Sequence, residues 1–264
     1  ALYRPQPVRT LFVDDCINTQ TDFNAGGARY YWSVINVAGL INVIDSLSAI
    51  ETLVYREKRY DAATFIRLLE TRDPVFLAQC ARCPKHGVAD PEVGRIAGIV
   101  SERIYSAFET HTCTPRGKYF PVSNQFVTYV DAGRGVRATP DGRADGDPLC
   151  DSCGAIHGRD TEGPTAMLSS TAALRLSKAL GSPVTNLRMA KEHLSTLLLP
   201  LLSAFFAEGG MQLQITCASR EELLDALDHP EKHASLIVRI GGYSEYFNRL
   251  SPELKQSVIA RTEY

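Results

Sequence analysis

Apolar residues recur at intervals of three and four along several stretches of this chain, which is the spacing of one face of an α-helix. The pattern predicts helices over residues 40–54, 61–69, 91–108 and 194–206. In the first of these, Asp45 and Ser46 fall on the other side of the helix from the apolar positions. The apolar face of that helix consists of Leu40, Val43, Ile44, Leu47, Ile50, Leu53 and Val54.

Three shorter runs have the composition of β-strands. Residues 126–130 and 236–240 are rich in β-branched and aromatic or other apolar side chains, and the second run is predicted to be a buried strand. Residues 211–216 alternate between apolar and polar side chains, as a half-buried strand does. No internal repeat or low-complexity tract is present. The patterns therefore predict a mixed chain of helices and strands.

Composition and charge exclude several classes of protein. The 264 residues are 44% hydrophobic with a formal net charge of -2, which describes a globular chain able to bury a sizeable core. No basic patch is present, so nucleic acid is not an expected partner. The longest apolar run, residues 197–202, is broken by Pro200, and no membrane span is expected. Because the chain starts at Ala1 without an initiator Met or a secretory signal, we expect a fragment or a trimmed chain.

The seven cysteines, with no export signal, favour reduced thiols in a cytoplasm. Cys80 and Cys83 form one CxxC pair, followed by His86, and Cys150 and Cys153 form another, so a tetrahedral zinc site is one hypothesis. Zinc ribbons place their pairs roughly 15 to 20 residues apart. Here a much longer stretch of helical and loop sequence separates the two pairs. We therefore expect unligated cysteines and no metal site.

Two loops are rich in glycine or other turn formers. Residues 24–30 could cradle a phosphate, but the glycine spacing that points amides at a pyrophosphate is missing, so a structural loop is expected. Residues 139–149 predict a long surface loop or an active-site lid. His193, His229 and His233 lie among charged residues and are expected to be solvated or capping.

The stretch with the most specific pattern lies near the C-terminus. Residues 236–240 lead into Gly241-Gly242, and glycine permits backbone geometry closed to residues with a Cβ. Ser251 and Pro252 then supply an N-cap and an N1 proline for a last helix. Taken alone, the glycine pair predicts a β-turn before a terminal helix.

The wider string around this glycine pair is more specific. Residues 239–244 read Arg-Ile-Gly-Gly-Tyr-Ser, and Leu-Ser-Pro-Glu-Leu follows at 250–254, with Arg-Thr-Glu at 261–263. This order resembles the C-terminal signature of the glycyl radical enzymes, the family of pyruvate formate-lyase and the diol, choline and hydroxyproline lyases. Residues 138–143 and 160–166 are similar to the start of that family's radical domain. The resemblance implies that Gly242, which directly precedes the aromatic residue, stores an unpaired electron on its Cα.

The chemistry of such a radical requires glycine. A Cα radical is stabilised when it becomes planar and conjugates with the amide groups on both sides, and a side chain would clash with that planar arrangement. The radical must also be shielded from oxygen and water. We therefore expect the loop to be buried inside a larger body.

The resemblance covers essentially the whole chain, as about the last third of a typical family member, and it implies an α/β fold. Residues 1–133 would form the C-terminal part of the pyruvate formate-lyase-like barrel domain, a segment of a ten-stranded α/β barrel. Residues 134–264 would form the glycyl radical domain. The family's thiyl cysteine and the glutamate base of its dehydratases lie upstream of Ala1, and Cys16 does not match that cysteine. Residues 84–90 depart from a Lys-Tyr-Gly-Asn-Asp turn of many members, which leaves the subfamily open.

The implied function is that of a glycyl radical lyase, which dehydrates a small polar substrate or cleaves another C–X bond in it through a thiyl radical. No bound cofactor is expected, because an activating enzyme with an iron–sulfur cluster and S-adenosylmethionine would install the radical at Gly242. The other implied partners are the rest of the barrel, the substrate and, at full length, a second copy in a homodimer, in an anaerobic cytoplasm. Formate C-acetyltransferase activity, or a radical-carrier subunit inactive alone, are the alternatives. Without the thiyl cysteine this chain is expected to be inactive by itself, and to expose sheet edges that aggregate or bind a partner.

Overall fold

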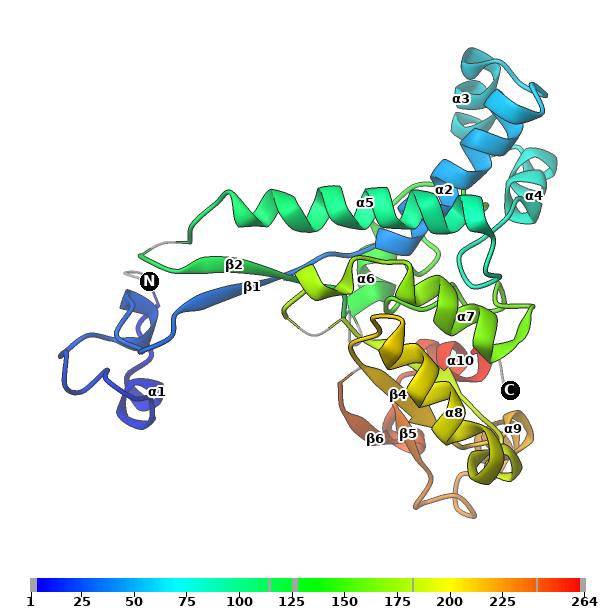
Figure 1. Cartoon of the computed structure of the whole chain (residues 1–264). Helices are drawn as coiled ribbons and strands as arrows, with labels where there is room; N and C mark the ends of the chain where they lie inside the picture. The colour runs from blue at the N-terminus through cyan, green and yellow to red at the C-terminus, as the bar shows by residue number, and fades with distance from the viewer. Residues whose placement is uncertain (1–3, 114, 125–127, 182, 241, 262–264) are drawn as a thin grey trace.

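The computed structural model describes residues 4–113, 115–124, 128–181, 183–240 and 242–261, and it combines helices with short strands (Figure 1). The elements up to residue 134 are α1 (Pro7–Phe12), η1 (Phe23–Ala25), β1 (Trp32–Asn36), α2 (Leu40–Ile50), the π-helical turn η2 (Glu51–Arg56), α3 (Ala62–Glu70), α4 (Pro74–Arg82), α5 (Pro91–Glu109), β2 (Lys118–Val122) and α6 (Thr128–Arg134). The later elements are α7 (Gly163–Ala172), η3 (Leu176–Lys178), β3 (Thr185–Arg188), η4 (Lys191–His193), α8 (Leu194–Ala207), β4 (Leu213–Thr216), α9 (Arg220–Asp228), β5 (Ile237–Arg239), β6 (Ser244–Tyr246), η5 (Phe247–Arg249) and α10 (Pro252–Ala260).

The four helices predicted from apolar periodicity are all present. Residues 40–54 form α2 and most of η2, 61–69 correspond to α3, 91–108 to α5 and 194–206 to α8. The long helix α5 begins where its sequence indicates, because Asp90 accepts hydrogen bonds from the main-chain N–H groups of Glu92 and Val93. Helix α5 packs along α2 and beside the parallel pair β1 and β2, which extend together toward the N-terminal α1 (Figure 1).

The side of the first helix opposite its apolar positions is not exposed to solvent. Asp45 is fully buried and Ser46 is also buried, whereas Val43 is 45% exposed. The reason is that α2 is covered on more than the apolar face, since the Asp45 carboxylate accepts a hydrogen bond of 2.7 Å from the main-chain N–H of His86. A helix that is enclosed by loops as well as by α5 buries polar positions that periodicity alone assigns to solvent.

The strand predicted over residues 126–130 is also wrong, because residues 128–130 open helix α6; Phe126 and Val127 lie outside the described residues. Tyr129 is buried, and its hydroxyl donates a hydrogen bond of 2.5 Å to Ser257 Oγ on α10. The apolar and aromatic composition at this position therefore reflects helix packing and not strand pairing.

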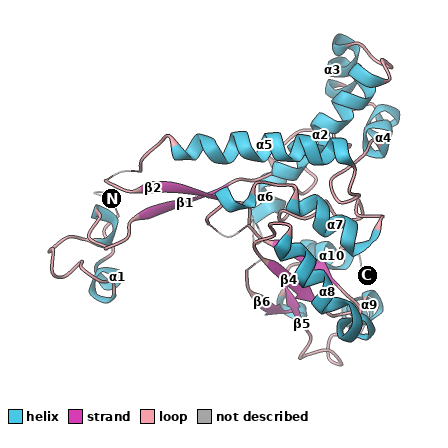
Figure 2. Cartoon of the chain, in the orientation of Figure 1, coloured by secondary structure: helices cyan, strands magenta, loops and turns pink. Residues whose placement is uncertain are grey.

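The described strands form three separate two-stranded sheets, as shown in magenta in Figure 2. β1 pairs with β2 and β3 with β4, both in parallel, whereas β5 and β6 form an antiparallel hairpin. The alternating run at 211–216 is confirmed as β4. The run at 236–240 contains β5, but it is only partly buried, since Val238 is enclosed and Ile237 is 54% exposed.

The hydrophobic core does not divide at residue 133. One cluster of buried side chains joins Ile41 and Ile44 of α2 and Ile96 of α5 to Cys150, Cys153 and Leu174. A second cluster packs the β5–β6 hairpin against α9 and α10 through Leu223, Val238, Phe247 and Val258. The domain boundary at 133/134 stays a prediction. Over the described ranges, no helix has both the length and the hydropathy needed to cross a membrane.

Candidate functional site

The β5–β6 hairpin places Gly242 at its tip. Arg239 faces Ser244 in the strand register, and the next residue, Ile240, donates its main-chain N–H to the Tyr243 carbonyl at 3.0 Å. Gly242 therefore lies in the connection between the two strands. Gly242 has φ +86°, in the left-handed region that a residue with a side chain rarely adopts. Gly241 lies outside the described residues.

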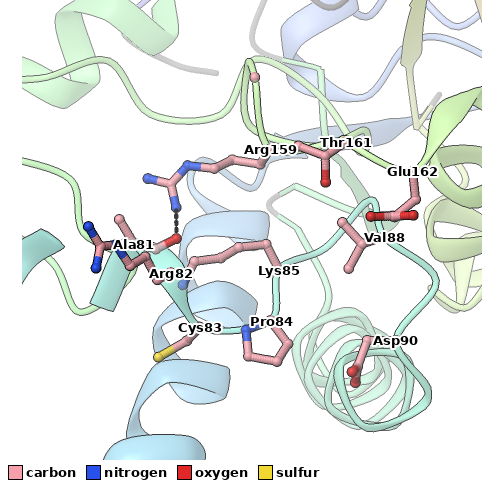
Figure 3. A pocket seen from close by; sticks show the side chains of 11 residues that line it. Ala81, Arg82, Cys83, Pro84, Lys85, Val88, Asp90, Arg159, Thr161 and Glu162 are labelled. Carbon is pink, nitrogen blue, oxygen red and sulfur yellow. Dashed lines mark hydrogen bonds between the residues drawn. The ribbon is translucent and has the colours of Figure 1, made fainter. Parts of the chain in front are cut away.

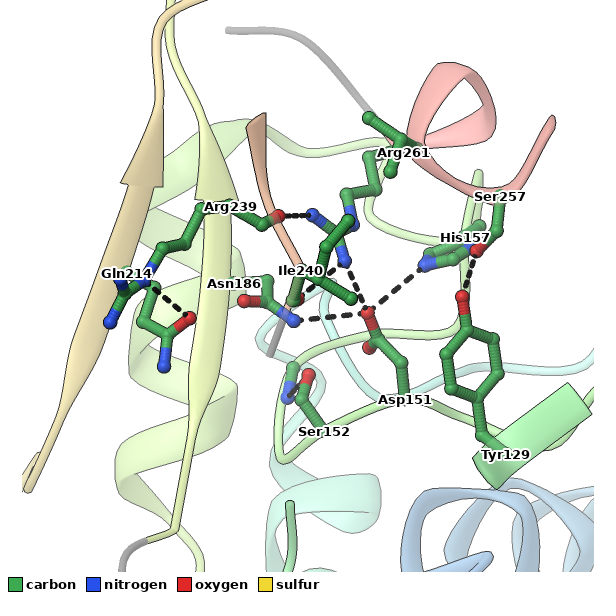
Figure 4. A network of polar contacts seen from close by, with 12 residues as sticks. Tyr129, Asp151, Ser152, His157, Asn186, Gln214, Arg239, Ile240, Ser257 and Arg261 are labelled. Atoms are coloured by element: carbon green, nitrogen blue, oxygen red, sulfur yellow. Dashed lines mark hydrogen bonds and ion pairs between the residues drawn. The ribbon is translucent and has the colours of Figure 1, made fainter. Parts of the chain in front are cut away.

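Both peptide groups that flank the Gly242 Cα are hydrogen-bonded to side chains. The Gly242 N–H donates to Gln214 Oε1 at 3.0 Å, and the Gly242 carbonyl accepts from Arg239 Nη2 at 3.3 Å. Arg239 Nε also donates to Gln214 Oε1 at 3.2 Å, and its Nη1 donates to Ser244 Oγ. Gln214 lies on the neighbouring β4, beside Arg239 (Figure 4), and is 5% exposed by its accessible surface. The glycine is thus held by β4 as well as by its own hairpin.

Arg261, directly after α10, fixes the strand that leads into the glycine pair. Its Nη1 donates to the Arg239 carbonyl at 2.6 Å, and its Nη2 donates to the Ile240 carbonyl at 2.9 Å. The same Nη2 donates to Asp151 Oδ2 at 3.0 Å, as Figure 4 shows. The Arg261 and Asp151 side chains are both almost completely buried. The C-terminal helix and the hairpin are therefore connected through one guanidinium group.

Asp151 is the counter-charge of this arginine. Besides Arg261, its Oδ2 accepts a hydrogen bond from Asn186 Nδ2 at 3.0 Å and lies 3.5 Å from His157 Nε2. Burial by itself would raise the pKa of Asp151, but the nearby His157 ring and the charge of Arg261 outweigh it and hold that pKa well below its usual range. The carboxylate is consequently charged at neutral pH, in a cluster that supports the hairpin.

Sequence reasoning did not assign these supporting residues. Asp151 lies inside the second CxxC pair, where the cysteines were the candidate functional groups, and Arg261 was noted only as part of the terminal string. Gln214 occupies a polar position of an alternating strand, which is a weak signal for a buried side chain. A buried Asp and a buried Arg can be located only when the elements that enclose them are known.

The hairpin tip faces outward on this chain. Gly242 and Ser244 are exposed, and Tyr243 is 37% exposed. This chain therefore does not itself provide the shielding that a radical needs. The burial of the loop inside a larger body stays a prediction.

The four CxxC cysteines lie in two different cores. Cys80 and Cys83 pack with α3 and α4, whereas Cys150 and Cys153 pack with α2 and α5. Burial raises the pKa of the Cys80 and Cys153 thiols to about 12. His86 is also buried, with its Nε2 3.0 Å from the Cys153 carbonyl oxygen. Within the described part of the chain, no three His, Cys, Asp or Glu side chains are grouped to hold a metal ion.

The predictions for the two loops at residues 24–30 and 139–149 have different outcomes. In residues 24–30 the amides of Gly26 and Gly27 donate to the main-chain carbonyls of Phe23 and Asp22, directly before the loop, which supports the structural interpretation. The surface-loop prediction for residues 139–149 is wrong at Asp141 and Arg143, which are both buried. Asp141 accepts a hydrogen bond of 2.7 Å from Asn42 Nδ2 on α2, so this loop packs on the helix.

A cavity of about 530 Å³ lies between the end of α4 and residues 158–162 (Figure 3). Two of its basic side chains are directed at main-chain carbonyls. Lys85 Nζ donates to the Cys80 carbonyl at 2.7 Å, and Arg159 Nη1 donates to the Ala81 carbonyl at 3.1 Å. The Arg159 contact joins α4 to the later loop, and the Lys85 contact closes the C-terminal end of α4, so a structural role accounts for both cations.

Two family models match this chain. The Pyruvate formate lyase-like model matches residues 1–131, and the Glycine radical model matches residues 150–248, which include the whole hairpin. The chain belongs to the glycyl radical enzyme family. The resemblance found in the sequence is therefore confirmed, and so is the fold, since the solved structures that match are barrels of this family.

Individual relatives match over nearly the full length of this chain. It is 29% identical to trans-4-hydroxy-L-proline dehydratase of Clostridioides difficile, over 100% of this chain and 34% of that protein. It is 31% identical to a pyruvate formate-lyase-like enzyme of Escherichia coli K12, over 88% of this chain and 31% of that protein. The glycerol-bound B12-independent glycerol dehydratase of Clostridium butyricum superposes with a TM-score of 0.92 at 29% identity, over 98% of this chain and 34% of that one. This chain spans about a third of the length of these relatives.

Proposed function

We propose that this chain is the radical-storing part of a glycyl radical lyase and that Gly242 carries the radical. The observation that supports this most is the position of Gly242, at left-handed φ in the hairpin connection and directly before Tyr243. Gln214 and Arg239 form hydrogen bonds with the two amide groups with which a Cα radical would conjugate.

The proposed sequence of events has three hydrogen transfers. A radical derived from S-adenosylmethionine on an iron–sulfur activating enzyme takes one hydrogen atom from the Gly242 Cα. The Gly242 radical then takes the hydrogen atom of an upstream cysteine thiol, which leaves a thiyl radical. The thiyl removes a hydrogen atom from a C–H bond of the substrate. After the substrate has reacted, the hydrogen atoms return in the reverse order, so the glycyl radical is restored. No residue of this chain is assigned the thiyl role.

We propose dehydration, or cleavage of another C–X bond, as the reaction class, because dehydratases match almost the whole chain. The substrate would be a small polar molecule, such as a vicinal diol or a hydroxylated amino acid. Formate C-acetyltransferase activity is the alternative, supported by the pyruvate formate-lyase-like relative. The activated full-length enzyme should release an aldehyde from 1,2-propanediol or glycerol, or act on a hydroxylated amino acid. Formation of acetyl-CoA and formate from pyruvate and CoA would favour the alternative.

The radical position is tested with the full-length enzyme, activated anaerobically. Electron paramagnetic resonance should show a doublet, and oxygen should then cut the backbone at Gly242 and release a fragment beginning near Tyr243. Gly242→Ala should abolish both signals, because a methyl group opposes the planar radical and φ +86° strains any residue with a Cβ. Gly241→Ala is the matched control and should keep a doublet. A doublet that persists in Gly242→Ala, or cleavage elsewhere, would contradict the assignment.

A radical-carrier subunit and the whole enzyme are distinguished by mixing. A carrier should restore activity to an oxygen-cleaved relative while being inactive alone. A full-length enzyme of this family should form product from its substrate without such a partner, once activated as a homodimer.

A further inference from the structure

The side chains of Arg239 and Gln214 form a closed set of contacts around Gly242. Gln214 Oε1 accepts from the Gly242 N–H at 3.0 Å and from Arg239 Nε at 3.2 Å, and Arg239 Nη2 donates to the Gly242 carbonyl at 3.3 Å. The Gly242 Cα thus lies between an amide whose hydrogen is bound by an acceptor and a carbonyl whose oxygen is bound by a cation.

We propose that Arg239 and Gln214 tune the electronic structure of the Gly242 radical, an inference that rests on the proposed radical position. A glycyl radical is stabilised because the nitrogen on one side donates electron density and the carbonyl on the other withdraws it. An acceptor on the N–H strengthens the donation by the nitrogen, since hydrogen bonds polarise the groups that they join. A guanidinium on the carbonyl oxygen strengthens the withdrawal, since charge-assisted hydrogen bonds are roughly twice as strong as neutral ones. Both contacts therefore shift spin density from the Cα to the neighbouring amides.

The resting geometry of the loop adds a requirement. At φ +86° the plane of the preceding peptide is far from the plane of a radical centre at Cα, so conjugation needs about a quarter turn around the N–Cα bond. Gln214 and Arg239 reach Gly242 through the ends of side chains with several rotatable bonds, which can follow this turn. The strand carbonyls before the glycine pair are instead bound by the buried Arg261. The rotation is thereby confined to the hairpin tip.

The test is the α-proton splitting of the radical doublet in the activated full-length enzyme. Arg239→Met removes the cation from the carbonyl and Gln214→Met removes the acceptor from the N–H, so each should increase the splitting, because more spin stays on the Cα. Gln214→Glu keeps an acceptor oxygen and should leave the splitting at or below the wild-type value. Arg239→Lys keeps the positive charge but not the several N–H donors of the guanidinium, and should give a splitting between those of wild type and Arg239→Met.

Arg249→Met is the matched control. Arg249 is an exposed arginine close in sequence whose guanidinium packs 4.9 Å from the centre of the Tyr246 ring, and its replacement should leave the splitting unchanged. A splitting equal to wild type in both Arg239→Met and Gln214→Met would overturn the inference while leaving the radical position intact. A missing doublet in the wild-type enzyme, or one that survives in Gly242→Ala, would instead refute the proposed function. If Arg239→Met gives no radical, the splitting measured in Gln214→Met alone tests the inference, because this variant leaves Arg239 in place. A splitting equal to wild type in Gln214→Met would then overturn the inference.

Discussion

Asp45 in α2 and Asp151 below the hairpin are both buried carboxyl groups, and their pKa values shift in opposite directions. Burial raises the pKa of Asp45 to about 7, against the charge of Lys85 and the N–H of His86. Burial acts in the same sense on Asp151, but His157 and Arg261 reverse the shift. Lys85 directs its ammonium to the Cys80 carbonyl, whereas Arg261 donates directly to the Asp151 carboxylate.

The opposite pKa shifts reflect the groups that surround each carboxylate. A buried carboxylate stays charged only where cationic donors are aimed at it, and such a pair fixes geometry more than it adds net stability. In the hairpin region the pair also holds the carbonyls of Arg239 and Ile240. In α2 the carboxyl group mainly receives a single main-chain N–H. We therefore expect mutations at the two aspartates to have unequal consequences.

The largest expected effect is that of Asp151→Asn. It leaves the buried Arg261 without its counter-charge, which should destabilise the hairpin region by about 3–5 kcal/mol. Hydrogen exchange of the full-length protein should show faster exchange in peptides covering residues 236–246. Asp45→Asn at pH 7 is the control and should leave those peptides unchanged. Equal exchange in the two variants would remove the distinction between the regions.

Arg261→Lys should have the next largest effect. Lysine keeps the positive charge, but it cannot reproduce the fork that reaches the carbonyls of Arg239 and Ile240 together with Asp151. Losing one of these Arg261 hydrogen bonds should lower the stability of the hairpin region by about 2–3 kcal/mol, since hydrogen bonds to charged groups contribute about 1.5–3 kcal/mol each. The same exchange experiment measures it. A wild-type exchange rate in Arg261→Lys would show that charge alone holds the hairpin.

The pH dependence should also separate the two aspartates. The folded-state pKa of Asp45, about 7, lies above the ordinary value of 3.8, so its stabilising contribution is complete below about pH 4 and is lost as pH rises through 7. Asp45→Asn should remove this loss, which amounts to roughly 2–3 kcal/mol between pH 5 and pH 8. Asp151, with a lowered pKa, contributes above about pH 4 and loses its contribution in acid. Thermal unfolding of wild type and Asp45→Asn between pH 5 and 8 measures the difference, and parallel curves would contradict it.

The smallest expected effect concerns metal. Cys150 and Cys153 flank Asp151, and among the residues that the structure describes the Asp151 carboxylate pairs with Arg261 and is not grouped with the cysteines around a metal site. Elemental analysis of protein purified without added metal should therefore find no stoichiometric zinc, and Cys→Ser variants at positions 80, 83, 150 and 153 should not change the metal content. One zinc per chain, lost with any of these four substitutions, would show the prediction to be wrong.

Several features were determined by the sequence alone because their causes are local. Helices α3, α5 and α8 follow from apolar spacing, and α10 begins at Ser251, whose side chain accepts the Leu254 N–H. The family and the expected radical glycine also follow from a contiguous string, and the family is confirmed by the matched models. Each of these signals lies within a few turns of helix or one hairpin.

The tertiary structure decided which polar side chains are enclosed. Asp45 was predicted on a polar face and is buried, and residues 128–130 were predicted in a strand and are helical. Asp151 meets Arg261 across 110 positions of sequence, and Gln214 meets Gly242 across 28. Periodicity reports which side of an element is apolar, but a buried polar contact depends on which distant elements pack there. The residues that contact the hairpin, Gln214 and Arg261, were therefore identified only from tertiary packing, whereas Gly242 was identified from the sequence.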